Sequence, residues 1–316
     1  MLTTQRSIGQ SIIHLIFFGN YHYALYAVAL SIEANMQLEL PLNPLAYYSC
    51  IFLITLVYYT YAYQGNAICI TSTPPYIRNV RSNWYVQYQQ WVRFSQLLCS
   101  VLGIGIGIYL LVCHWTNLFR LSLSTLGLAA GVVLLAALYY GWLPIFGHRP
   151  HIRQQGWIKP FIIGWVWAGL VTVSPVLFYQ IEYNTFYPIN GMWVWLFCKN
   201  WLFISLTCIM FDIKDYASDA NHQLKTFVVQ YGLRTTLFYI LIPLTVLVLA
   251  SFLIVAYIRH FPGMRVLLNL IPFLALLWTV YGLHQRRSIL YYLIIIDGLL
   301  LVKALCGIVA ALLGKI

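Results

Sequence analysis

The stretch NGMWVWLFCKNWLFISLTCIMFDIKDYASD, residues 190–219, joins a long apolar segment to a group of three carboxylates. Its apolar part, 190–212, is long enough to cross the hydrocarbon core of a bilayer as a helix. The spacings of Asp212, Asp215 and Asp219 predict that all three lie on one face of a helix, over about two turns. Because the whole chain has only seven carboxylates, three together favour a bound cation. Carboxylate oxygens suit Mg²⁺, which completes its shell with water and substrate phosphate.

The composition extends this interpretation to the whole chain. Of its 316 residues, 61% are hydrophobic and 8% are charged, and the mean hydropathy is +0.78. A soluble domain of this length does not bury so much apolar surface, so we expect an all-α integral membrane protein. The apolar segments predict nine transmembrane helices of about 20 residues each. Their expected limits are 11–34, 44–66, 92–113, 122–141, 159–181, 190–212, 233–257, 264–284 and 290–313.

The loops between these spans set the orientation. With the N-terminus in the cytoplasm, twelve of the 18 lysines and arginines fall on the inner side and four on the outer side. This positive-inside bias predicts a cytoplasmic N-terminus and an outer C-terminus, in a membrane that we expect to be a bacterial plasma membrane. The net charge of +11 is mostly a sign of topology. It attracts anionic lipid headgroups and gives no reason to expect a nucleic-acid partner.

The order of the loops predicts two four-helix halves plus a ninth helix around a central cavity, within a single domain, 1–316. The loops after the second and sixth spans both lie on the inner side, and each follows the second helix of a four-span unit. Gly103, Gly105 and Gly107 in the third span predict a face of small residues for close helix packing.

Basic residues share the inner side with the three aspartates. Arg153 and Lys159 precede the fifth span, where Pro160 suits the first helical turn, and Lys225 follows the acidic group. Arg153 and Lys159 contact either lipid headgroups or a phosphate. Lys225 pairs with an aspartate or reaches a phosphate oxygen as a point charge.

Two further features have two interpretations each. The second span ends in Tyr58–Asn66, with four tyrosines. These form an interfacial aromatic belt, or else Tyr59 and Tyr63 line a cavity and present their ring faces to a positively charged reacting group. The ninth span holds Asp297 and Lys303 at membrane depth, where charged groups are costly and often functional. They form an internal pair or face a wet cavity.

The motif Asp212-x-x-Asp215-x-x-x-Asp219, followed by Lys225-Thr226 and Gly232, resembles the second aspartate-rich motif of the UbiA superfamily of membrane prenyltransferases. The nine expected spans, the orientation and Lys159-Pro160 are also similar to that family. The resemblance implies that Asp212, Asp215 and Asp219 hold Mg²⁺. It further implies that Lys225, Lys159 and Arg153 bind an isoprenyl diphosphate, and that the prenyl group passes to a lipophilic acceptor.

The sequence departs from the family pattern in two places. The first aspartate-rich motif is expected at the end of the second span, but Tyr58–Asn66 contains no carboxylate, and only Gln64 and Asn66 offer oxygen ligands. The glycine expected before Lys225 is replaced by Gln223. Two alternatives therefore stay open beside prenyl transfer. One is a non-catalytic relative that binds an isoprenoid or lipid, in which Arg78 and Arg81 replace part of the missing site. The other is a transporter that uses Asp297 and Lys303.

Overall fold

The computed structural model describes residues 8–71, 80–139, 156–221 and 223–314. Within these ranges the chain forms helices and no strand, as the apolar segments predicted. Six helices are long and apolar enough to cross a membrane, and the number is seven if the bent pair Ile8–Phe18 and Tyr21–Gln37 counts as one. Shorter apolar helices, Leu45–Tyr61 and Leu123–Ala137, coincide with the second and fourth expected spans. These lengths and compositions are consistent with a membrane protein.

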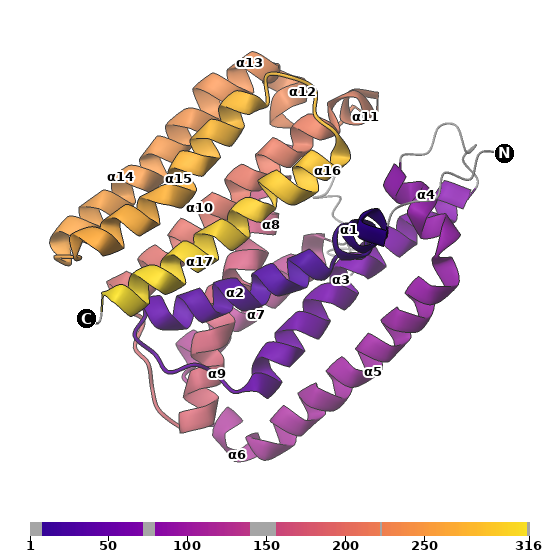
Figure 1. Ribbon diagram of the computed structural model, residues 1–316. Helices are drawn as coiled ribbons and strands as arrows, with labels where there is room; N and C mark the ends of the chain where they lie inside the picture. The colour runs from indigo at the N-terminus through magenta and orange to yellow at the C-terminus, as the bar shows by residue number, and fades with distance from the viewer. Residues whose placement is uncertain (1–7, 72–79, 140–155, 222, 315–316) are drawn as a thin grey trace, which may run out of the picture. The chain divides into compact units, whose positions relative to one another are not determined.

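The chain divides into two compact units. Unit 1 is 1–28 with 43–115, and unit 2 is 29–42 with 116–316. Unit 1 contains the first helices of Figure 1, where α3 packs along α5. Its elements are α1 (Ile8–Phe18), the first part of α2 (Tyr21–Gln37), α3 (Leu45–Thr71), α4 (Val80–Gln87) and α5 (Gln89–Cys113).

The first expected span, 11–34, is not one straight helix. α1 and α2 meet at a bend of 60°, because Asn20 takes the left-handed conformation with φ of 67°. Gly19 is required beside it, since a Cβ there would lie 2.3 Å from the carbonyl oxygen of Leu15. The carbonyl of Phe18, which the bend frees from the helix, accepts a hydrogen bond of 2.8 Å from the Tyr85 hydroxyl. Satisfied carbonyls make such a break tolerable in an apolar setting.

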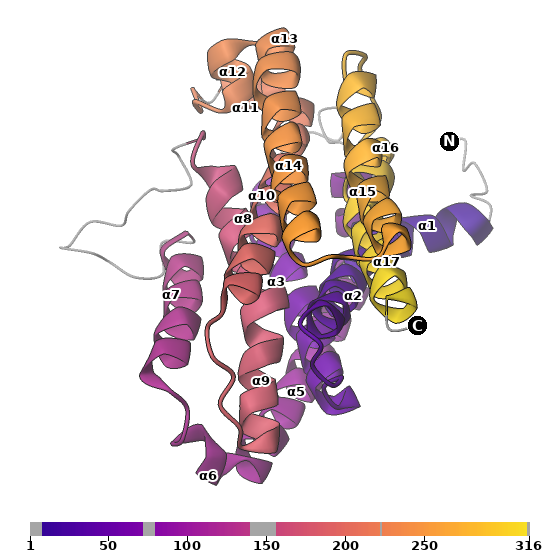
Figure 2. The ribbon, with the colours of Figure 1, turned by 90° about the vertical axis from the view of Figure 1, so that its left-hand side faces the viewer.

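Unit 2 contains the rest of the chain, including the second part of α2. Figure 2 shows α14, α15 and α17 side by side, and the contacts of unit 2 also join α8 to α10 and α7 to α8. Its further elements are α6 (Trp115–Leu118, which begins at the unit boundary), α7 (Leu123–Tyr139), α8 (Lys159–Ala168), η2 (Gly169–Val173), α9 (Ser174–Tyr183), α10 (Gly191–Lys214), α11 (Tyr216–Asn221), α12 (Phe227–Tyr231), α13 (Leu233–Thr235), η3 (Thr236–Leu241), α14 (Ile242–Ile258), α15 (Gly263–Gly282), α16 (Ile289–Tyr291), η4 (Tyr292–Ile296) and α17 (Gly298–Leu313).

The pairing of α8 with α10 determines where the acidic motif lies. Pro160 sits in the first turn of α8, as predicted. The indole nitrogen of Trp201 on α10 donates to the carbonyl of Phe161 on α8 at 2.8 Å. A Cβ on Gly164 would lie 2.3 Å from Ser205 Oγ and 2.8 Å from the carbonyl oxygen of Trp201. The two helix backbones therefore approach each other as closely as glycine allows.

The glycines of the third expected span do not pack in this way. A Cβ on Gly105 or Gly107 would meet no described atom within 4 Å, and one on Gly103 would meet only Leu53 Cβ, at 3.5 Å. The predicted close-packing face is wrong for the described part of the chain. A close glycine contact between two helices lies instead at Gly164 in α8.

Replacing these glycines with alanine tests the difference. We expect Gly164→Ala to lower the free energy of unfolding by about 1–3 kcal/mol, because its methyl group overpacks the contact between α8 and α10. The matched control Gly105→Ala has open space and gains helix propensity, so its stability stays level or rises. Thermal unfolding midpoints in one detergent measure both. Equal midpoints for the two variants would contradict the assigned contact.

Candidate functional site

The three aspartates of the motif lie where one helix ends and another begins. Asp212 is in the last turn of α10, Asp215 caps that helix with φ of −93° and ψ of 8°, and Asp219 is in α11. The prediction of one continuous helix is therefore wrong. Asp215 breaks the helix, although the Asp219 N–H still donates to the Asp215 carbonyl at 2.8 Å. The C-terminal end of a helix carries partial negative charge, so it disfavours carboxylates.

Lys159 is the cation that α8 brings to this end of α10. Its Nζ donates to Asp212 Oδ1 at 2.7 Å, and Asp212 is 4% exposed. Lys214 pairs with Asp215 in the same way at 2.9 Å, but that carboxylate is partly exposed. The predicted site residue Lys159 thus contacts an aspartate in this structure.

Two carboxylate oxygens at this end are buried without a hydrogen-bond partner. They are Asp212 Oδ2 and Asp219 Oδ2, and the hydroxyl oxygen of Thr226 is a third buried atom in this state. Leaving such groups unsatisfied costs free energy. A cation would give both carboxylate oxygens the positively charged partner that they lack. Proteins usually contribute one or two carboxylates to the coordination shell of Mg²⁺. By their chemistry, Asp212 and Asp219 are therefore the two residues at this end that suit a divalent cation.

The described part of the chain does not place further metal-ligating side chains beside these two carboxylates. No group of three or more histidine, cysteine or carboxylate side chains within them is placed to hold a metal ion. Asp215, the third predicted ligand, is engaged by Lys214. The ligand set of three aspartates remains a prediction.

The segment after α11 packs against the residues that precede α8. A Cβ on Gly156 would lie 2.5 Å from the Thr226 amide nitrogen and 2.9 Å from the Lys225 carbonyl oxygen. Thr226 is buried, whereas Lys225 is exposed. Gln223 adopts φ of 55°, a left-handed conformation that favours glycine. Arg153 lies outside the described residues.

The tyrosines predicted to line a cavity belong to unit 1. Tyr59 stacks on Tyr23, with ring centroids 4.3 Å apart. The guanidinium carbon of Arg81 lies 3.6 Å from the centroid of the Tyr63 ring, so the cation on this ring is a protein side chain. Asn66 falls in α3, and its side chain is outside what the structure describes.

Arg81 is one of the two arginines that the non-catalytic alternative assigns to the missing half-site. It is 2% exposed, and its Nη2 donates to Asn20 Oδ1 at 2.6 Å. A buried side chain with these partners stabilises the junction of α1 and α2. Arg78 lies outside the described residues.

Sequence reasoning missed a second charged cluster, which is wholly within unit 2. Glu33 of α2, Lys199 of α10 and Lys303 of α17 are each at most 4% exposed. Lys303 Nζ donates to Glu33 Oε2 at 2.5 Å, and Lys199 Nζ lies 3.6 Å from Glu33 Oε1. A Cβ on Gly307 would lie 2.6 Å from the Glu33 carboxylate, so the contact requires glycine. The partner of Lys303 is therefore Glu33. The available signal was two lysines and one glutamate within apolar spans.

Comparison with protein-family models, curated proteins and solved structures finds no match to this chain.

Asp219 generates a prediction about pH. Burial raises the pKa of Asp219 from 3.8 to about 6. Lys159 and Lys214 lower this pKa, and the neighbouring carboxylates of Asp212 and Asp215 raise it further. The folded protein thus holds the proton more tightly than the unfolded chain does, and the free energy of unfolding falls as pH rises from about 4 to about 6. Asp219→Asn removes this contribution. The thermal unfolding midpoint of the variant, relative to that of wild type, should therefore rise between about pH 4 and pH 6 and stay constant above that. A parallel course for both proteins would contradict the shift, and Ser218→Ala is the control.

Glu33 generates a prediction about stability. Glu33→Gln leaves two lysines buried without a carboxylate, which should cost about 3–5 kcal/mol. Adding Lys199→Met to that variant should restore part of the loss, because it removes one of the two buried cations. Thermal unfolding in detergent measures both, with Glu39→Gln, which changes an exposed carboxylate of unit 2, as the control. A Glu33→Gln protein as stable as wild type would show that the cluster contributes nothing.

Proposed function

We propose that this chain is a membrane prenyltransferase of the UbiA type. It transfers an isoprenyl group from an isoprenyl diphosphate to a lipophilic acceptor and depends on Mg²⁺. In this proposal the chain crosses a bacterial plasma membrane nine times, with its N-terminus in the cytoplasm and its C-terminus outside. The two shorter apolar helices then complete the set of spans.

One observation carries the proposal. Asp212 and Asp219 each bury an unsatisfied oxygen beside Lys159, at the end of an apolar helix. Two carboxylates and a lysine are the groups that bind a metal–diphosphate headgroup, the carboxylates through the metal and the lysine directly. Such a headgroup on an apolar chain is the chemical form of an isoprenyl diphosphate.

A second observation supports the resemblance in the loop after the aspartates. Gln223 takes a left-handed conformation at the position where the related motif carries glycine. A non-glycine residue pays a strain cost there of order 1 kcal/mol. The backbone at Gln223 thus has the left-handed conformation typical of glycine, although the residue is glutamine.

The residues have separate roles in this proposal. When bound, Mg²⁺ neutralises negative charge on the diphosphate. Asp212 and Asp219 would hold the cation, and Asp215, which Lys214 engages here, would be the third carboxylate of the predicted set. Lys159 fixes the orientation of Asp212 through Oδ1, so that Oδ2 stays available. Lys225 is exposed, so in this proposal its side chain approaches the diphosphate as a point charge, together with Arg153.

A non-catalytic relative is the second candidate, favoured by the absence of any carboxylate in Tyr58–Asn66. With that motif gone, a bound diphosphate has one acidic site in place of two. Arg81 does not fill the gap, because it is buried against Asn20 and Tyr63. This candidate predicts binding of isoprenyl diphosphate without turnover.

Release of diphosphate by purified full-length protein tests the proposal. The assay supplies isoprenyl diphosphates of several lengths, Mg²⁺ and a panel of quinone, aromatic and lipid acceptors. We expect Mg²⁺-dependent release that Asp212→Asn or Asp219→Asn lowers roughly 10²–10³-fold, because each removes a group that stabilises developing charge.

Glu182→Gln makes the same chemical change elsewhere in unit 2, so it should keep the wild-type rate. Mg²⁺-dependent binding that Asp212→Asn abolishes, without release, would favour the non-catalytic candidate. The absence of both binding and release across the panel would refute both candidate functions.

A further inference from the structure

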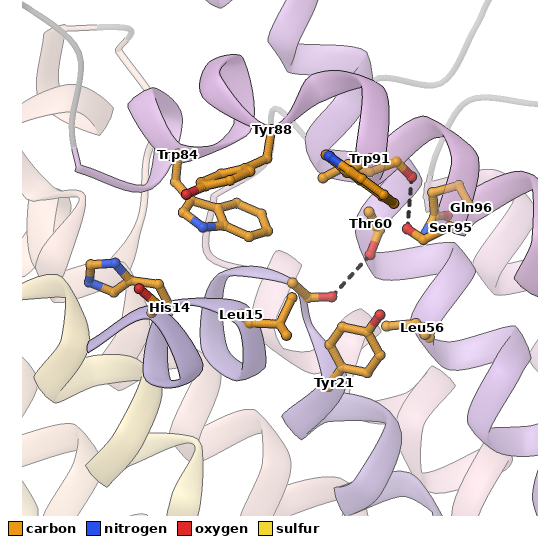
Figure 3. A pocket seen from close by; sticks show the side chains of 13 residues that line it. His14, Leu15, Tyr21, Leu56, Thr60, Trp84, Tyr88, Trp91, Ser95 and Gln96 are labelled. Carbon is orange, nitrogen blue, oxygen red and sulfur yellow. Dashed lines mark hydrogen bonds between the residues drawn. The ribbon is translucent and has the colours of Figure 1, made fainter. Parts of the chain in front are cut away.

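Unit 1 holds a pocket of about 440 Å³ (Figure 3). Every residue that lines it belongs to unit 1, and the side chains come mainly from α1, α3, α4 and α5. This volume is within the range of small-molecule sites, which is about 300–1,000 Å³. None of the residues assigned above to the diphosphate lines the pocket, so a ligand here is independent of the proposed prenyl transfer.

Aromatic rings form much of the pocket wall. Figure 3 shows the rings of Trp84 and Tyr88 on one side and the ring of Tyr21 across from them. Two neighbouring rings hold Trp84 in place, with centroids 5.4 Å away for Tyr88 and 6.1 Å away for Phe18. The face of an aromatic ring carries partial negative charge. It therefore attracts C–H groups next to oxygen atoms, because their hydrogens carry partial positive charge.

Two hydroxyl groups of the lining have already used their hydrogens. Thr60 donates to the Gly19 carbonyl at 3.5 Å and accepts from Asn20 Nδ2 at 3.1 Å. Ser95 donates to the Val92 carbonyl at 2.9 Å. A hydroxyl has one hydrogen to donate and two lone pairs, so these two groups can only accept from a ligand. A ligand that carries its own O–H groups makes use of them, whereas one with carbonyl oxygens alone does not.

Two further polar side chains of the lining offer both donors and acceptors. They are Gln96 on α5 and His14 on α1. A carboxamide has both kinds of group, and a neutral imidazole has one of each. In Figure 3, His14 lies at one side of the pocket, and Gln96 lies with Ser95 at the other. A ligand with hydroxyl groups around its whole edge therefore meets polar partners on both sides.

The distribution of charge favours an uncharged ligand. Unit 1 has four arginines and no aspartate or glutamate, so its potential repels cations. The described lining contains neither lysine nor arginine, so an anion would lose its hydration without a permanent positive partner. His14 supplies a positive charge only when it is protonated. Binding of an anion would therefore depend on pH, whereas an uncharged ligand needs no charged partner.

We propose that this pocket binds an uncharged sugar ring of the hexopyranose class, either as a free glycoside or as the headgroup of a glycolipid. A sugar ring has C–H groups on its faces, which stack on the aromatic walls. Its edge carries hydroxyl groups, which donate to Thr60 and Ser95 and exchange hydrogen bonds with Gln96 and His14. The lining thus complements both the faces and the edge of the ring.

The rim of the pocket accommodates the alkyl chain of a glycolipid. Trp91 is 73% exposed and Leu15 is 50% exposed, although both line the cavity. α5 continues from Trp91 as a span whose most apolar window has no buried residue. A chain linked to the sugar would lie along this apolar face of α5.

Binding of radiolabelled octyl β-D-glucoside to full-length protein in phosphatidylcholine nanodiscs tests this proposal. The glucoside is used well below the concentration at which it forms micelles, and empty nanodiscs give the blank. Neither diphosphate nor Mg²⁺ is present, so failure here is distinct from failure of the prenyl-transfer assay. We expect saturable binding that unlabelled octyl glucoside displaces equally well at about pH 5.5 and about pH 8, on either side of the usual histidine titration.

Three competitors define the class of ligand. Octyl tri(ethylene glycol) has the same tail but mainly ether oxygens, decyl-benzoquinone has a flat ring with carbonyl oxygens alone, and octyl phosphate is an anion with the same tail. Each lacks the ring of O–H donors, so each should displace the glucoside roughly tenfold less well or worse, at both pH values.

Methyl β-D-glucoside distinguishes the two sources of the sugar. It carries the same ring without the tail. Displacement as effective as that by octyl glucoside identifies a free sugar as the ligand, whereas clearly weaker displacement identifies the headgroup of a glycolipid. Either result supports a sugar site in this pocket.

Two pairs of variants locate the site. Gln96→Leu removes a polar partner and should weaken glucoside binding roughly three- to tenfold, whereas Gln90→Leu, exposed on α5 outside the lining, should leave it unchanged. Leu15→Trp fills the pocket from its exposed rim and should abolish saturable binding. Ile12→Trp, on the same helix and outside the lining, should not. None of the four positions is buried, and thermal unfolding midpoints check that each variant folds.

Four outcomes would overturn the proposal. The first is the absence of saturable binding to wild type. The second is displacement by octyl tri(ethylene glycol), by the quinone or, at about pH 5.5, by octyl phosphate that equals displacement by the glucoside. The third is unchanged or tighter binding by Gln96→Leu, which would indicate an apolar occupant. The fourth is an equal effect of Leu15→Trp and Ile12→Trp, which would place the ligand elsewhere.

Discussion

The close approach of α8 and α10 is the constraint on which the acidic site depends. Gly164 allows the two backbones to meet, and the Trp201 indole ties α10 to the first turn of α8. The start of one helix therefore lies beside the end of the other, and Lys159 reaches Asp212. Without this contact, Asp212 would be a buried carboxylate at the negative end of a helix dipole, which is unfavourable on both grounds.

Charge is distributed very unevenly between the two units. All seven carboxylates fall in unit 2, and unit 1 has arginines without a single acidic residue. Unit 1 stabilises its buried Arg81 with an amide oxygen and a tyrosine ring. Unit 2 uses lysines against carboxylates, in the pair Lys159–Asp212 and in the cluster around Glu33. These charges of unit 2 are therefore ion-paired, whereas Arg81 in unit 1 relies on uncharged partners.

Several features were predictable because they depend on local chemistry. The all-helical fold followed from long apolar segments, and the position of Pro160 followed from its missing N–H. Other features depended on partners far away in the chain. The break at Asn20 is stabilised by Tyr85 and Arg81, and the partner of Lys303 comes from α2, 270 residues away. The glycines of the third span matched a packing motif, but motif spacing does not show whether another helix faces them.

The sequence by itself determined the class of the protein, because the balance of apolar and charged residues is a property of composition. It also identified the three aspartates as unusual, since carboxylates are rare in this chain. Only the tertiary structure decided which of them are buried, that Lys159 is the partner of Asp212, and that Lys303 and Lys199 meet at Glu33. These outcomes depend on which helix faces lie opposite each other, and packing between distant segments determines that.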